Sequence, residues 1–195
     1  MPRKRAPDMT RTKILNSALR AFAEKGYARA SMDEIAEGAG VTKGALYWHF
    51  DDKLELYRSL VDHVLEMQTV AVMPSLDAGK PAHEMVSELV HSYLRFYREN
   101  GLVMAFYSNM MMEVKTLSEA GIMAAIAEVY REYRRAVASA LKKGGRRGAR
   151  DHEARASVLI GALDGLVMQW MLDPEGFDPD PVGEALVELY STSEG

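Results

Sequence analysis

The sequence predicts an all-α protein. Apolar residues recur at intervals of three and four along most of its 195 residues, the spacing that places them on one face of a helix. Alternation with a period of two, the pattern of a half-buried strand, is never sustained long enough to indicate one. Glycine- and proline-containing stretches separate the periodic segments, and capping residues stand where several of them begin. We therefore expect an N-terminal group of short helices followed by a larger helical body.

The first helix is predicted from about residue 10. Ile14, Ala18 and Phe22 follow one another at a spacing of four, so they lie on one face. Gly26 provides a natural stop after this stripe.

Two further short helices are predicted before residue 50. Ser31 and Glu34 form a capping box that opens the second helix, which Gly40 breaks. Thr42 is placed to cap a third helix through about Tyr47. A helix this short is unstable alone, because nucleation costs more than its few hydrogen bonds return, so it must dock on its neighbours.

The fourth helix is predicted to open at a second capping box, formed by Asp52 and Glu55, and to end near Pro74. The body then reads as further helices separated by "SLDAGKP", Gly101, "GGRRGAR" and "DPEGFDPDP". Their expected ranges are about 82–99, 102–115, 119–143, 151–172 and 182–191.

Three short helices with a tight turn between the second and third describe a helix-turn-helix unit, whose recognition helix enters the major groove of DNA. We expect this unit over residues 10–53, preceded by a basic flexible arm over 1–9. Residues 54–195 are then the helical effector-binding and dimerisation domain. The charge supports the division, since residues 1–60 hold 11 Lys and Arg against 8 Asp and Glu, whereas residues 61–195 hold 13 against 20.

The stretch "TKGALYWHF" carries the candidate base contacts. Lys43 and Tyr47 are neighbours one helical turn apart, while Leu46 is expected to point inward. Gly44 and Ala45 are small enough to let the helix backbone approach base edges, and Ala45 suits a thymine methyl group.

The aromatic residues that follow are candidates for the DNA backbone. Tyr47 and His49 have polar tips on rigid rings, which suit phosphate contacts. Lys53 lies at the start of the fourth helix, where backbone amides also favour phosphate. Trp48 is included among the DNA contacts, with an internal aromatic corner as the alternative. Phe50 is expected to pack inside.

The segment "AFAEKGYARASMDEIAEGAGVTKGALYWHFDDKLELY" resembles the DNA-binding domain of the TetR (tetracycline-repressor-like) transcription regulators. The resemblance covers roughly residues 10–60. It implies that one group of residues faces bases or the groove wall, namely Lys43, Gly44, Ala45 and Tyr47. It also implies phosphate contacts by Ser31, Thr42, Tyr47, His49 and Lys53. Because Gly44 and Ala45 stand where some relatives have larger polar residues, we expect DNA shape to carry part of the specificity.

The helix predicted over 151–172 carries small residues between large apolar ones. With the helix over 182–191 it is expected to form a four-helix bundle across a two-fold axis, because a DNA palindrome requires a dimer. The candidate interface residues are Gly161, Ala162, Gly165 and Leu186. The alternative is close packing within one subunit.

The chain holds 13 methionines, and several of them stand with aromatic residues in "YLRFYRENGLVMAFYSNMMMEV". Methionine side chains suit irregular cavities, so this segment is a candidate ligand pocket, with ordinary core packing as the alternative for each residue. Asp164, the one acid within the apolar run 158–172, is a candidate counter-ion for a cationic ligand. The expected lining is Phe96, Met104, Tyr107, Met110, Met111, Asp164 and Met168.

The resulting hypothesis is a homodimeric repressor that a small, largely apolar ligand releases from a palindromic double-stranded operator. A constitutive DNA-binding regulator or activator without an effector is the alternative, and a helical carrier or enzyme is the remote one. No nucleophile triad, metal-ligand spacing or phosphate loop is present in the sequence, so we expect no catalysis, metal or cofactor. The chain has no cysteine, signal peptide or membrane-spanning run, so we expect a cytoplasmic protein without a membrane partner.

Overall fold

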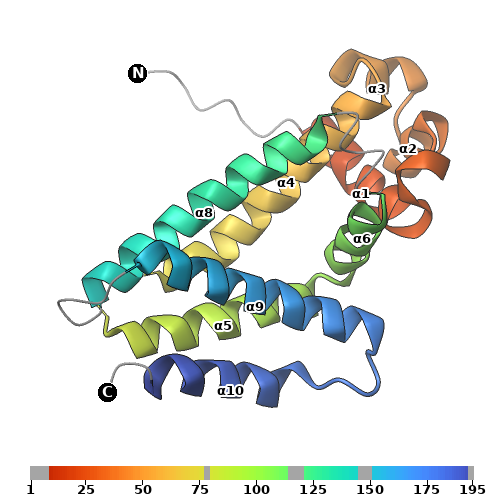
Figure 1. Cartoon of the computed structure of the whole chain (residues 1–195). Helices are drawn as coiled ribbons and strands as arrows, with labels where there is room; N and C mark the ends of the chain where they lie inside the picture. The colour runs from red at the N-terminus through yellow and green to blue at the C-terminus, as the bar shows by residue number, and fades with distance from the viewer. Residues whose placement is uncertain (1–8, 77–79, 114–120, 145–150, 193–195) are drawn as a thin grey trace, which may run out of the picture. The chain divides into compact units, whose positions relative to one another are not determined.

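The computed structural model describes residues 9–76, 80–113, 121–144 and 151–192, and within these ranges it holds helices and no strand (Figure 1). The predicted all-α fold is confirmed. The elements are α1 (Met9–Arg29), α2 (Met32–Ala39), α3 (Lys43–His49), α4 (Lys53–Val72), the 3-10 turn η1 (Met73–Ser75), α5 (Ala82–Glu99), α6 (Gly101–Met112), α8 (Ile122–Gly144), α9 (His152–Leu172) and α10 (Pro179–Thr192). The predicted arm, apart from Met9, lies outside the described residues, and so does the separator "GGRRGAR", apart from Gly144. The adjoining ends of the helices predicted over 102–115 and 119–143 lie outside them as well.

The chain divides into two compact units. The points of division differ from the predicted domain boundary, which lies after residue 53. The first comprises residues up to Val64 together with the segment from Ala105 to Met123, and the second comprises the remainder. The boundary falls within α4, because the first half of that helix packs with the N-terminal helices. Leu56, Tyr57 and Leu60 from this half are all buried.

The caps expected for the N-terminal helices are present. The Ser31 hydroxyl accepts a hydrogen bond of 3.2 Å from the N–H of Glu34 and so caps α2. Gly40 ends α2 in the left-handed region, with φ at +65°. The Thr42 hydroxyl accepts a hydrogen bond of 3.1 Å from the N–H of Ala45 at the start of α3. These local interactions set the turn between the two helices.

The core of the first unit joins α1, α2, α3 and the first half of α4. Its fully buried members include Ile14, Phe22, Ile35, Leu46, Phe50 and Leu56. The rings of Phe22 and Tyr57 meet edge to face at 4.9 Å, and Tyr57 also lies 5.3 Å from the ring of Phe106 on α6. Phe50 is therefore interior, as predicted, and the end of α6 belongs to this core.

Polar contacts also fix the end of α6 to α1. The Asn109 side chain donates to the backbone oxygens of Phe22 and Ala23, at 3.2 and 2.7 Å. These carbonyls precede the kink at Gly26, where φ is +74° and the helix is interrupted. The Glu113 carboxylate accepts hydrogen bonds from the next backbone N–H groups, those of Tyr27 at 2.8 Å and Ala28 at 3.3 Å. Asn109 of α6 and Glu113, which directly follows this helix, thus satisfy backbone groups on both sides of the kink.

In the second unit α10 packs against both α5 and α9 (Figure 1). Gly183 makes the close approach to α5 possible, since a Cβ there would lie 2.8 Å from Cδ1 of Leu94 and 3.2 Å from Cγ1 of Val90. Buried residues of α5, α8 and α9 complete the core, among them Leu89, Val137, Leu159 and Leu163.

Candidate DNA-binding surface, ligand cavity and dimer face

The helix α3 has one buried side and one exposed side. Leu46 is fully buried, as predicted, whereas Tyr47 is 41% exposed and Trp48 is 80% exposed. Trp48 is therefore not part of an internal aromatic corner, and its ring rests only edge to face on His49, at 4.6 Å. The backbone at Gly44 is accessible, because even a Cβ there would lie 4.0 Å from its nearest neighbour, Oγ1 of Thr42. This exposed side has the size and composition of a groove-contacting surface.

Lys43, at the start of α3, is exposed and paired with Asp33 of α2. The ammonium lies 2.7 Å from one carboxylate oxygen and 3.0 Å from the other. The hydrogen bond to Asp33 raises the pKa of Lys43, so its positive charge is retained at neutral pH. The pair links the two helices at the exposed surface, where such an ion pair contributes little stability.

Ser31 and Thr42 begin α2 and α3, and each uses its side-chain oxygen as an acceptor for a helix cap. Each hydroxyl keeps its O–H to donate to a phosphate oxygen. Both remain candidates for the predicted phosphate contacts, and the exposed ends of two helices stand beside them.

Lys53 has a structural role that the sequence interpretation missed. Its ammonium donates to the backbone oxygens of Tyr27, Ala28 and Ala30, at 2.7, 3.3 and 3.0 Å. It also lies 4.7 Å from the centre of the Tyr27 ring. An ammonium has three N–H donors, so a phosphate contact would require one of these bonds to be given up.

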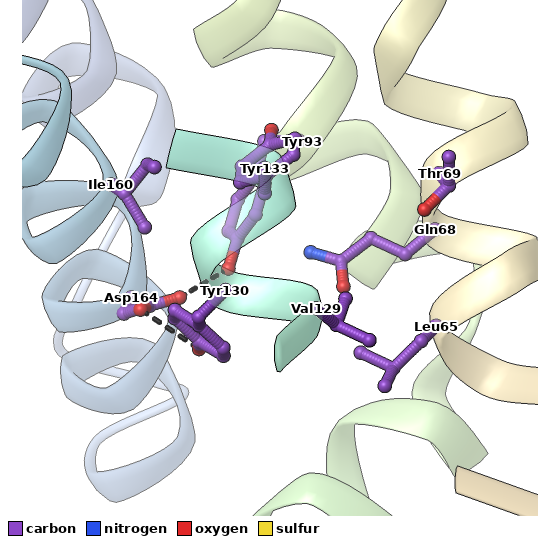
Figure 2. A pocket seen from close by; sticks show the side chains of 9 residues that line it. All are labelled: Leu65, Gln68, Thr69, Tyr93, Val129, Tyr130, Tyr133, Ile160 and Asp164. Carbon is purple, nitrogen blue, oxygen red and sulfur yellow. Dashed lines mark hydrogen bonds between the residues drawn. The ribbon is translucent and has the colours of Figure 1, made fainter. Parts of the chain in front are cut away.

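A cavity lies in the second unit between α4, α5, α8 and α9 (Figure 2). Aliphatic side chains and three tyrosines form most of its wall, and Gln68 extends into it from α4 (Figure 2). Its lining consists of Leu65, Gln68, Thr69, Tyr93, Val129, Tyr130, Tyr133, Ile160 and Asp164. A mainly apolar wall with a few polar groups is typical of a small-molecule site.

Asp164 is the polar centre of this cavity. One carboxylate oxygen accepts a hydrogen bond of 2.5 Å from the Tyr93 hydroxyl, and the other accepts one of 2.9 Å from Tyr130 (Figure 2). Burial raises the pKa of Asp164 above its ordinary value, although the two phenol hydrogen bonds oppose that rise. The Tyr133 hydroxyl is also buried, and it has no hydrogen-bond partner among the residues that the structure describes.

Asp164 is the one residue of the predicted ligand set that lines this cavity. Phe96 is buried against Tyr97, Met104 is half-buried and Met168 is exposed. The other members, Tyr107, Met110 and Met111, belong to the first unit. The sequence interpretation missed Gln68, Tyr130 and Tyr133. The three-residue spacing of the two tyrosines was the available signal, since it places them on one side of α8.

The predicted dimer residues fall into two groups. Gly161 and Gly165 face open space in the described part of the chain, since a Cβ on either would meet none of its atoms within 4 Å. Ala162, in contrast, is half-buried, and Leu186 is buried within the unit. The glycines share a face of α9 with exposed apolar side chains at spacings of three and four, namely Val158, Met168 and Leu172, and α10 exposes Leu189. A contiguous apolar face of this kind is typical of an association surface.

The described part of the chain contains neither a candidate membrane span nor a candidate metal cluster. No helix there is long and apolar enough to cross a membrane. The same residues contain no group of three or more His, Cys, Asp or Glu side chains placed to hold a metal ion.

A helix-turn-helix with an exposed recognition helix, followed by a helical unit with its own cavity, defines a DNA-binding transcription regulator. The chain matches the family described as "Bacterial regulatory proteins, tetR family" over residues 14–60 and the "BetI-type transcriptional repressor, C-terminal" family over residues 82–190. It belongs to the TetR family, whose members are transcription regulators rather than enzymes.

Individual relatives cover most of the chain. It is 31% identical over 179 residues to the transcriptional regulator TtgR of Pseudomonas putida. The matched region covers 87% of this chain and 83% of TtgR. It is 29% identical over 180 residues to the transcriptional repressor BepR of Brucella suis, at 87% and 84% coverage.

Solved structures show the same fold. A complex of SmeT with triclosan superposes with a TM-score of 0.79 at 23% identity, covering 94% of this chain and 90% of that one. The regulator FadR of Bacillus subtilis in complex with stearoyl-CoA superposes with a TM-score of 0.76 at 18% identity, covering 91% and 96%.

Proposed function

We propose that this protein is a homodimeric repressor that leaves its DNA operator when a small ligand enters the cavity of the second unit. The observation that carries the proposal is the continuity of α4. This helix begins at Lys53, soon after α3 ends, and continues to Leu65, Gln68 and Thr69, which line the cavity. A ligand that displaces these side chains acts on the same helix that packs with the helix-turn-helix.

The exposed side of α3 is the proposed DNA-reading surface. Lys43 and Tyr47 are the candidates for base edges, with Ala45 and Gly44 allowing close approach of the helix. The candidates for phosphate are Ser31, Thr42, Tyr47, Trp48, His49 and Lys53. The Asp33 carboxylate holds Lys43 at this surface before DNA arrives.

Dimerisation is proposed through the exposed face of α9 and α10. Two such helices from each subunit form a four-helix bundle about a two-fold axis. The two recognition helices of a dimer then read half-sites separated by about one turn of DNA, roughly 34 Å. A palindromic operator follows from this symmetry.

Ligand and DNA are coupled by linkage. A ligand lowers operator affinity only as far as DNA lowers ligand affinity, typically by about 1–3 kcal/mol. Repressors among the relatives and a neighbour solved with triclosan support a ligand-released repressor. The same relatives leave open a constitutive regulator that has no effector.

The test begins with selection of bound sequences from random DNA duplexes. The selected operator should be palindromic, and the logarithm of affinity should fall linearly with the logarithm of salt concentration. A compound library is then screened for loss of operator binding. Release by compounds that also raise the melting temperature would support the proposal. DNA binding that no compound weakens would favour the constitutive regulator, and absence of duplex binding would refute both.

A further inference from the structure

The cavity around Asp164 has a definite charge and hydrogen-bonding character. Among its lining residues there is no Lys, Arg or His, so an anionic ligand would find no counter-charge and would meet the Asp164 carboxylate. Burying an unpaired anion beside another carboxylate is strongly unfavourable. The lining therefore selects against carboxylates and phosphates.

Asp164 is also poorly suited as a counter-ion. Each of its carboxylate oxygens already accepts a hydrogen bond from a phenol, Tyr93 on one side and Tyr130 on the other. These neutral donors stabilise the charge without a cation. A cationic ligand would gain less here than at an unpaired carboxylate, and it would lose its own hydration on entry.

The group that lacks a partner in this cavity is neutral. The Tyr133 hydroxyl is buried and makes no hydrogen bond to any described residue, a condition that destabilises the fold. Burial raises the pKa of Tyr133, so the phenol stays protonated at neutral pH. A phenol both donates and accepts, and a ligand hydroxyl can pair with it in either direction.

The cavity must open to accept more than water. Its free space for water-sized molecules is about 30 Å³, whereas small-molecule sites are usually about 300–1,000 Å³. Gln68 and Thr69 stand at its more exposed side, and Gln68 extends across it from α4 (Figure 2). Displacement of Gln68 would expose the tyrosine rings, which prefer offset or edge-to-face contact with another ring.

We infer that the cavity takes an uncharged aromatic ligand carrying a hydroxyl group, which pairs with the Tyr133 hydroxyl while the ring replaces the Gln68 side chain. This inference rests on the proposed function only in assigning the cavity to a ligand. It names the chemical class of that ligand and the residue that recognises it.

The test uses four compounds with the same ring and different substituents. They are 2-naphthol, 2-methylnaphthalene as the analogue that can neither donate nor accept a hydrogen bond, the cationic naphthalen-2-ylmethylammonium and the anionic 2-naphthoate. Calorimetric titration of the full-length protein at neutral pH should rank 2-naphthol first. Its advantage over 2-methylnaphthalene should be about three- to tenfold, the value of one neutral hydrogen bond.

Substitution of Tyr133 should then remove the advantage of 2-naphthol. In Tyr133→Phe the naphthol and 2-methylnaphthalene should bind with equal affinity. Tyr190→Phe is the matched control, because Tyr190 lies in the same unit but outside the cavity and donates to the backbone oxygen of Arg155. Thermal unfolding without ligand checks that both variants are folded.

Four results would overturn the inference. They are tighter binding of the ammonium or the naphthoate, equal binding of naphthol and 2-methylnaphthalene to the parent, an unchanged naphthol preference in Tyr133→Phe, and no binding of any naphthalene compound. Preference for the ammonium that Asp164→Asn abolishes would make Asp164 a counter-ion after all. The failures are distinguishable, since naphthol binding without operator release contradicts only the repressor proposal. Operator release by charged compounds alone contradicts only the ligand class.

Discussion

The carboxylate of Glu113 lies against Gly26 in the space that any other side chain at that position would enter. A Cβ on Gly26 would stand 3.0 Å from Oε1 of Glu113 and 3.3 Å from its carboxyl carbon. The same carboxylate accepts the N–H of Tyr27, the residue directly after the kink. The left-handed φ at Gly26 and the packing of α6 on α1 are thus parts of one arrangement.

We predict that Gly26→Ala destabilises the protein by about 1–3 kcal/mol, because the new residue must adopt a left-handed conformation and displace Glu113. The free energy of unfolding from denaturant titration measures this. Gly101→Ala is the control, since a Cβ there meets nothing within 4 Å.

A double-mutant cycle with Glu113→Ala separates the two causes. The cost of Gly26→Ala should be smaller in the Glu113→Ala background, because only the backbone strain remains. Equal costs in both backgrounds would show that the two residues are not coupled.

The two lysines around α3 should respond differently to truncation. Lys43→Ala removes an exposed side chain, so we expect little change in stability but a loss of specific DNA affinity of about 1–3 kcal/mol. Tyr47→Ala should have a similar effect on affinity. Binding to the selected operator is measured by fluorescence anisotropy, and parental affinity in both variants would be inconsistent with α3 as the recognition helix.

Lys53→Met should instead lower stability, since three backbone carbonyls lose a charged donor. We expect a loss of at least about 1 kcal/mol in denaturant titration. If Lys53→Met unfolds like the parent while its DNA affinity falls, Lys53 acts on phosphate and not on the end of α1.

The glycines of the second unit give a prediction about association. Gly161→Leu and Gly165→Leu should shift the protein toward monomer by overpacking the proposed dimer face. Gly183→Ala should lower the stability of the unit itself, because its Cβ would press on Leu94. Light scattering and thermal unfolding together distinguish these effects. An unchanged dimer in both leucine variants would place the interface elsewhere.

Asp164 predicts a pH dependence of stability. Its folded-state pKa is raised, chiefly by burial, so the folded chain binds this proton more tightly than the unfolded chain does. The contribution of Asp164 to the free energy of unfolding must then fall as pH rises above 3.8, its ordinary value. The stability of Asp164→Asn relative to the parent should therefore increase from about pH 4 toward neutrality. Denaturant titrations of both proteins across this pH range measure the difference. If the relative stability of Asp164→Asn decreased with pH, the pKa of Asp164 would be lowered in the folded protein and the prediction would be wrong.

The sequence by itself determined the helices, the turn between α2 and α3 and the family. The capping residues Ser31 and Thr42 accept hydrogen bonds from backbone N–H groups three residues further along the chain. Both partners of each hydrogen bond therefore lie within one short stretch of sequence. The inward direction of Leu46 follows in the same way from the helical repeat.

The tertiary structure alone decided which of the other candidate site residues are exposed and which contact another helix. Gly161 and Gly183 are both glycines within predicted helices, and local sequence does not distinguish their surroundings. In the described structure Gly161 faces open space, whereas Gly183 packs against α5. Asp164 accepts a hydrogen bond from a phenol 71 residues away, and Glu113 accepts one from the backbone N–H of Tyr27, 86 residues away. Their partners lie on other helices, and helix-to-helix register depends on the packing of whole faces, which local periodicity does not specify.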